Sequence, residues 1–123
     1  MAPKLILIVE DDELLSRMYK NAFERAGLDV QVAHNGKTGI DLAKKENPDL
    51  IMLDILMPGM NGMSVLKSLK EDNATKNIKI IMLTGVDDKA MEEMARNMGA
   101  DDFIIKSEME LVDVVQRVIS YFK

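Results

Sequence analysis

The sequence predicts an α/β fold, a three-layer, doubly wound parallel sheet of (βα)5 order. Five short apolar runs alternate with five longer segments of helical spacing, and this alternation with short joints implies parallel strands and right-handed crossovers. Three of the runs, LILIV, LIML and IKIIML, are almost continuously apolar, as is typical of strands buried on both faces. The chain of 123 residues has the size of one domain, which we expect to span 1–123.

The predicted strands are short runs that are rich in aliphatic and β-branched residues, which favour extended structure. In chain order they are Lys4–Val9, Leu28–Ala33, Asp49–Leu53, Ile78–Leu83 and Asp102–Ile105. The intervening segments repeat apolar residues three and four positions apart, which places those residues on one face of a helix. These predicted helices carry Leu15–Ala26, Ile40–Ala43, Met63–Leu69, Met91–Met98 and Leu111–Phe122.

Helix ends are also marked in the sequence. Gly27 and Gly99 follow the first and fourth predicted helices, and Asn47-Pro48 follows the second. The fifth helix is expected to run almost to the C-terminus, which would leave no room for an output domain.

Composition excludes several classes of protein. The absence of cysteine removes disulfides, thiolate metal sites and cysteine nucleophiles, and it fits a reducing, cytoplasmic location. The net charge of −5 argues against direct binding of nucleic acid, which needs a basic surface. The longest apolar run, Leu5–Val9, is too short for a signal peptide or a membrane span, so we expect no membrane insertion.

Chemically active side chains follow four of the predicted strands. Glu10 and Asp11 follow the first strand, Asp54 the third, Thr84 the fourth and Lys106 the fifth. Ligands of doubly wound sheets bind at this carboxyl edge. Crowded carboxylates would repel one another, and a hard cation such as Mg²⁺ would remove the conflict. Carboxylates, a hydroxyl and an ammonium around one aspartate suit phosphoryl transfer, with Asp54 as the nucleophile.

Each group also has a plainer interpretation. The acids that follow the first strand could simply cap the first helix, where negative charge is favourable. Thr84 alone could be an ordinary loop hydroxyl, and Lys106 alone a solvated surface residue. Two enzyme classes fit poorly. An Asp-nucleophile phosphatase needs a second Asp where Leu56 stands, and a flavin-binding phosphate loop would not hold four acids.

The segments LILIVEDDELL, LIMLDILMPGMNG, IIMLTG and FIIKS resemble the receiver domain of two-component response regulators, of the single-domain chemotaxis type. The resemblance covers essentially the whole chain and implies the flavodoxin-like strand order 2-1-3-4-5. It also implies that Asp54 accepts a phosphoryl group from a sensor histidine kinase or a histidine phosphotransfer protein. Glu10, Asp11 and Asp54, with the backbone carbonyl of Leu56, would hold Mg²⁺, for which Mn²⁺ could substitute.

The remaining roles implied by the resemblance concern switching and signal lifetime. Lys106 would pair with the phosphoryl oxygens, and Thr84 would bond the phosphoryl group and shift inward together with Phe103. Leu56 and Val86 would border the path of the hydrolytic water. Since neither can orient that water, we expect slow dephosphorylation.

Two departures from the family pattern bear on this site. Lys106 precedes Ser107 where the family usually has proline after a cis bond, so the sequence leaves cis and trans open. Gly85 replaces the usual alanine, which should loosen the loop after the fourth strand.

Residues 87–113 hold nine acidic and three basic residues, a net charge of −6. In receivers the fourth helix, fifth strand and fifth helix form the usual output face, so we expect an unknown protein target with a basic surface. A solvated acidic face is the plainer alternative. The leading interpretation is therefore a stand-alone phosphorylation switch, not an enzyme beyond assisting its own phosphorylation and dephosphorylation. The alternatives are a receiver excised from a longer regulator or hybrid kinase, and a pseudo-receiver that works without phosphorylation.

Overall fold

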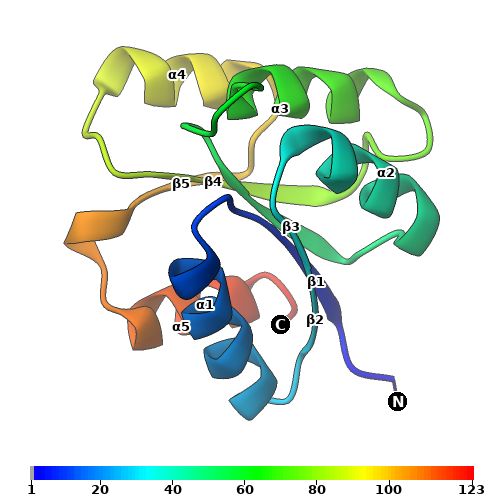
Figure 1. Ribbon diagram of the computed structural model, residues 1–123, viewed down its shortest axis with the longest axis vertical. Helices are drawn as coiled ribbons and strands as arrows, with labels where there is room; N and C mark the ends of the chain where they lie inside the picture. The colour runs from blue at the N-terminus through cyan, green and yellow to red at the C-terminus, as the bar shows by residue number, and fades with distance from the viewer. Residues whose placement is uncertain (1) are drawn as a thin grey trace.

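The computed structural model describes residues 2–123 as alternating strands and helices (Figure 1). The strands are β1 (Leu5–Val9), β2 (Asp29–Ala33), β3 (Leu50–Asp54), β4 (Lys79–Thr84) and β5 (Asp102–Ile105). The helices are α1 (Glu13–Arg25), α2 (Gly36–Glu46), α3 (Gly62–Glu71), α4 (Lys89–Asn97) and α5 (Leu111–Ser120). A short 3₁₀ turn, η1 (Lys106–Glu108), joins β5 to α5 and was not predicted from the sequence.

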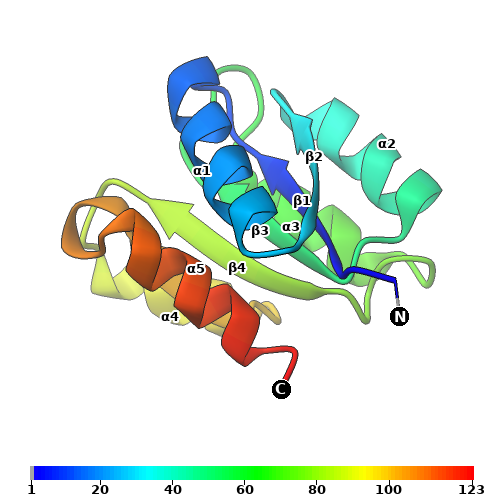
Figure 2. The ribbon, with the colours of Figure 1, turned by 90° about the horizontal axis from the view of Figure 1, so that it is seen from below.

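The five strands form one parallel sheet in the order β2-β1-β3-β4-β5. Helices α1 and α5 cover one face, and α2, α3 and α4 cover the other (Figures 1 and 2). The predicted three-layer α/β fold and its strand order are therefore confirmed. In this topology the direction in which successive strands are added reverses between β1 and β3. Ligands of such folds bind in the crevice outside the carboxyl ends of these two strands.

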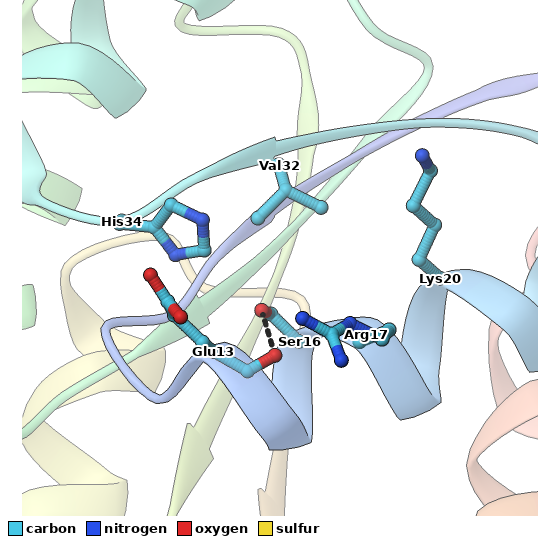
Figure 3. Close-up of a pocket in the computed structure, with 6 residues that line it drawn as sticks. All are labelled: Glu13, Ser16, Arg17, Lys20, Val32 and His34. Carbon is cyan, nitrogen blue, oxygen red and sulfur yellow. Dashed lines mark hydrogen bonds between the residues drawn. The ribbon is translucent and has the colours of Figure 1, made fainter.

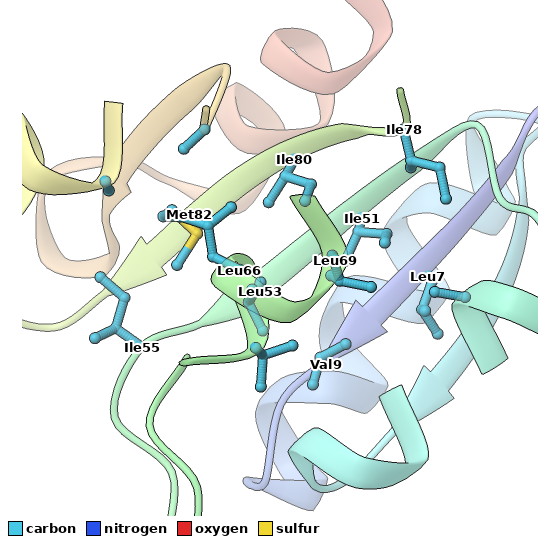
Figure 4. Close-up of a cluster of buried hydrophobic side chains, with 14 of the residues drawn as sticks. Leu7, Val9, Ile51, Leu53, Ile55, Leu66, Leu69, Ile78, Ile80 and Met82 are labelled. Carbon is cyan, nitrogen blue, oxygen red and sulfur yellow. The ribbon is translucent and has the colours of Figure 1, made fainter. Parts of the chain in front are cut away.

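The core consists of two apolar layers, one on each face of the sheet. Leu7, Leu53 and Met82 lie in the layer covered by α2, α3 and α4, to which α3 contributes Leu66 and Leu69 (Figure 4). Alternate residues of the same strands point to the opposite layer, which α1 and α5 cover. Its large buried side chains include Ile6, Ile8, Leu50, Met52 and Ile81 from the strands and Phe23 from α1. Burial on both faces is the reason that these strands read as continuous apolar runs.

Four helices begin with a side chain that caps their free backbone N–H groups. Asp12, Asn35, Asn61 and Asp88 each accept a hydrogen bond from an N–H in the first turn, at distances of 2.7–3.1 Å. The C-terminal end of α5 differs from the sequence prediction. The helix stops at Ser120 instead of continuing to Phe122, and a turn follows it. Among residues 2–123, no helix combines the length and apolarity that crossing a membrane would need.

Candidate functional site

The carboxyl edge of the sheet brings together the charged side chains that follow β1, β3 and β5. Asp54 is the last residue of β3, and Glu10 directly follows β1, the neighbouring strand. Carboxylate oxygens of Glu10, Asp11 and Asp54 lie within 4.8 Å of one another. Glu10 and Asp54 are almost fully buried, at 1% and 3% exposure, whereas Asp11 is not buried. We call these three residues the acidic cluster.

Lys106 reaches the acidic cluster from the turn after β5. Its Nζ atom lies 2.8 Å from Oε1 of Glu10 and 3.4 Å from Oδ1 of Asp54. The Lys106–Ser107 peptide bond is trans, as are all peptide bonds among the described residues. The question that the sequence left open is thereby answered: the 3₁₀ turn delivers the ammonium group to the cluster without a cis bond.

Burial and mutual repulsion govern the protonation of this cluster. Burial, together with the hydrogen bond and negative charge of Glu10, raises the pKa of Asp54 to about 7 against the opposing effect of Lys106. Burial lowers the pKa of Lys106, but the hydrogen bond to Glu10 and the charge of Asp54 outweigh it, so its pKa is raised. Lys106 therefore stays charged at neutral pH, while Asp54 titrates near it.

The acids after β1 divide between the two functions that the sequence suggested. Glu10 and Asp11 belong to the acidic cluster, whereas Asp12 caps α1 by accepting from the N–H of Leu15 at 3.0 Å. Asp12 also donates its own N–H to Oε2 of Glu10 at 3.2 Å, which fixes the Glu10 carboxylate. Glu13 starts α1, and its carboxylate points toward His34 (Figure 3).

Thr84 and Phe103 are both buried. Thr84 ends β4, one residue beyond Leu83, the register partner of Asp54, and its Oγ1 accepts the N–H of Val86 at 3.2 Å. Phe103 pairs with Met82 and lies, at 7% exposure, in the apolar layer beneath α4. Both side chains thus face inward in this structure.

The segment that follows Asp54 contributes a residue that the sequence analysis missed. A Cβ atom on Gly62 would lie 2.1 Å from the backbone oxygen of Asp54. The N–H group of Gly62 donates to the carbonyl of Ile55 at 2.7 Å. Only glycine allows α3 to start this close to the strand end that carries Asp54. The MPGMNG motif contained the signal, but its last glycine has no distinguishing local pattern. Leu56 and Val86 flank the site and are about half exposed, at 53% and 47%.

The donor set of the acidic cluster fits a hard divalent cation. Three carboxylates supply only oxygen, without the nitrogen or sulfur ligands that favour zinc or copper. Two of them are buried close to one another, so a cation would relieve their repulsion. The cluster is therefore a candidate metal site in a position where doubly wound folds bind ligands.

Comparison with known proteins identifies the family. The family model of the response regulator receiver domain matches residues 6–118. The chain belongs to the response regulator receiver domain family. This receiver domain is 36% identical over 104 residues to the polar-differentiation response regulator DivK of Brucella anthropi, covering 85% of each chain.

Solved structures confirm the fold of the receiver domain. The chemotaxis protein CheY4 of Vibrio cholerae superimposes with a TM-score of 0.90 at 24% identity, covering 97% of this chain and 98% of CheY4. The response regulator Rcp1, solved in its Mn²⁺-bound form, gives a TM-score of 0.85 at 24% identity and covers 98% of this chain and 94% of that chain.

Replacing Asp54 by asparagine is expected to stabilise the receiver domain at pH 8 without divalent cations, by on the order of 2 kcal/mol. The folded-state pKa of Asp54 is about 7, whereas an unfolded aspartate titrates near 3.9, about three units lower. Charging this group therefore opposes folding: the cost is absent below pH about 4, grows up to pH about 7 and is complete above it.

Urea unfolding at pH 5 and pH 8 measures this effect. The advantage of Asp54→Asn should be smaller at pH 5, and the exposed Asp87→Asn should change little at either pH. Equal stability of Asp54→Asn and the parent protein at pH 8 would contradict the raised pKa.

Proposed function

We propose that this protein is a stand-alone receiver that takes up a phosphoryl group on Asp54 and thereby changes its affinity for a protein target. The observation that carries the proposal is the acidic cluster with Lys106 at the carboxyl edge of a receiver fold. The 36% identity to DivK, itself a response regulator, supports a role in signalling. A sensor histidine kinase or a histidine phosphotransfer protein would be the donor, and the cytoplasm is the proposed location.

The chemistry proposed for Asp54 is nucleophilic displacement at phosphorus. A carboxylate oxygen of Asp54 forms the new P–O bond while the P–N bond of the donor phosphohistidine breaks and its imidazole leaves. Lys106, whose Nζ lies 3.4 Å from Asp54, would neutralise phosphoryl oxygens. Thr84 and Phe103 are the proposed switch residues, because both lie buried on the strands next to this edge.

Mg²⁺ is the proposed cofactor, with Mn²⁺ as a substitute. Glu10, Asp11 and Asp54 would hold it, together with the backbone carbonyl of Leu56. When bound, the cation would neutralise negative charge on the carboxylates and the phosphoryl group. The all-oxygen donor set supports this assignment, and so does the Mn²⁺-bound form of Rcp1.

Incubation with acetyl phosphate and Mg²⁺ tests the proposal. Intact-mass measurement should show a gain of one phosphoryl group in the parent protein and in Asp87→Ala, and no gain in Asp54→Ala. A gain that persists in Asp54→Ala would assign the modification elsewhere. No gain in any of the three would favour the alternative of a pseudo-receiver that binds its partner without phosphorylation.

Dephosphorylation is expected to be slow, because the two side chains that flank the site are apolar. Leu56 and Val86 are exposed but offer no group that could orient an attacking water. We expect Leu56→Asn to shorten the lifetime of the phosphoryl group severalfold, as followed by intact mass after the donor is removed. A half-life of only seconds for the parent protein with Mg²⁺ present would contradict the prediction.

The acidic segment 87–113 is the proposed target surface. Of its three basic residues, Arg96 pairs with Glu92 and Asp102, at 3.1 and 3.7 Å, and Lys106 reaches the acidic cluster. Lys89 is exposed and makes no ion pair within residues 2–123. Segment 87–113 contains six exposed acids that make no ion pair with any part of residues 2–123: Asp87, Glu93, Asp101, Glu108, Glu110 and Asp113. The surface offered to a partner is therefore strongly acidic, and binding to a basic target should weaken as ionic strength rises.

A further inference from the structure

A cleft of about 320 Å³ lies between α1 and β2, outside the acidic cluster (Figure 3). Its lining residues are Glu13, Ser16, Arg17, Lys20, Val32 and His34. Strand β2 is an edge strand of the sheet, so one side of the cleft is open to solvent. None of the lining residues has a part in the proposed phosphoryl chemistry.

Two cationic side chains in this cleft have no anionic partner. Arg17 and Lys20 make no ion pair with any carboxylate of residues 2–123, as is true of most Lys and Arg residues in that range. What sets Arg17 and Lys20 apart is that both line one cleft, a single helical turn apart on α1. A guanidinium group offers five N–H donors and an ammonium three, all available here to a ligand.

The opposite end of the cleft offers hydrogen-bond acceptors. Nδ1 of His34 lies 3.1 Å from the carbonyl oxygen of Glu10, and because a carbonyl only accepts, Nδ1 carries a proton; in the neutral ring Nε2 is then an acceptor. The carboxylate of Glu13 points toward the His34 ring and not along α1 toward Arg17 (Figure 3). Between the two ends, the hydroxyl of Ser16 lines the cleft; this residue is 2% exposed and donates to the carbonyl of Glu13 at 3.0 Å.

We propose that the cleft between α1 and β2 binds a small organic anion, whose phosphate or carboxylate group contacts Arg17 and Lys20. A hydroxyl or amino group at the other end of the same molecule would donate to His34 and Glu13. Planar guanidinium groups bind phosphate and carboxylate oxygens in pairs, which favours such a head group over a halide ion. The volume of the cleft accommodates a compact metabolite.

The cleft is distinct from the proposed phosphorylation site, but one hydrogen bond links the two. The hydrogen bond from His34 ends on the backbone of Glu10, whose side chain belongs to the acidic cluster. Without a divalent cation the acidic cluster repels anions, so an anionic probe is kept out of the phosphorylation site. Binding can therefore be measured independently of phosphoryl uptake.

Titration with two anions tests the proposal, with amide shifts as the readout. Glycerol 3-phosphate and inorganic phosphate are added at constant ionic strength and without divalent cations. We expect saturable shifts that centre on residues 16–20 and His34, and tighter binding of glycerol 3-phosphate because it also carries hydroxyl donors. Tighter binding of inorganic phosphate would contradict the proposed role of His34 and Glu13 as acceptors, while still supporting anion binding by Arg17 and Lys20.

Matched variants distinguish a site from general charge attraction. The double variant Arg17→Gln/Lys20→Gln should lose at least about tenfold in affinity for both anions. The control Lys45→Gln/Lys67→Gln removes the same charge from exposed lysines that make no ion pair within residues 2–123, and it should bind like the parent. Equal losses in both double variants, or shifts that do not saturate at the cleft, would overturn the proposal.

Discussion

At pH 8 without divalent cations, Lys106→Met is expected to lower the free energy of unfolding by about 3 kcal/mol. The Glu10 carboxylate is 1% exposed and would lose the ammonium group that lies 2.8 Å from it. Asp54 would lose its compensating charge as well, so two buried carboxylates would face each other unpaired. The raised pKa of Lys106 means that its contribution is fully present at pH 8 and is lost only at higher pH, as the ammonium deprotonates.

Urea unfolding of Lys106→Met should show that the loss is smaller at pH 5, because protonation of the carboxyl groups relieves their repulsion. Mg²⁺ should recover part of the loss at pH 8 if the acidic cluster holds the cation as proposed. The exposed Lys67→Met serves as the control for the substitution itself and should change stability little. A Lys106→Met variant as stable as the parent at pH 8 would contradict the ion pairs described above.

Gly62→Ala is expected to cost about 3 kcal/mol or more of folding free energy. The added methyl group would lie 2.1 Å from the backbone oxygen of Asp54 and 2.7 Å from Cα of Ile55. Both neighbours are backbone atoms, so no side chain can rotate away and the end of β3 must shift. Because that shift displaces Asp54, phosphoryl uptake from acetyl phosphate should slow as well.

Gly85→Ala is the matched control for this substitution. No heavy atom lies within 4 Å of a Cβ built on Gly85, and its φ is not positive. Its stability should equal that of the parent or exceed it by about 0.5 kcal/mol, because alanine restricts the unfolded chain. Thermal or urea unfolding of the two variants measures the difference, and comparable losses in both would show that close approach to β3 is not what requires Gly62.

Most of the fold could be predicted because burial leaves a direct trace in the residue pattern. Strands covered on both faces must be apolar throughout, and β1, β3 and β4 have that pattern. Element ends were less accurate, since they depend on local contacts. The turn η1 and the stop of α5 at Ser120 have no comparable apolar signal.

Prediction of the site was strongest where topology alone brings residues together. Glu10 and Asp54 follow neighbouring strands of a parallel sheet, so their proximity follows from the strand order. The sequence could not predict which of Glu10, Asp11 and Asp12 joins the acidic cluster and which caps α1. These three acids are consecutive, and only the direction of each side chain decides its contacts. That Asp12 caps α1 while Glu10 turns inward depends on the backbone after β1.

The order of apolar runs and helical segments was enough to predict the layer architecture and the residues available for chemistry at the carboxyl edge. Both depend on which residues follow each strand, and connectivity is read directly from the chain. Only the tertiary structure decided that a trans Lys106–Ser107 bond still brings Nζ to the acidic cluster, and that Gly62 must approach the backbone of Asp54. These are contacts between segments distant in sequence, and their geometry depends on how the packed elements place each loop.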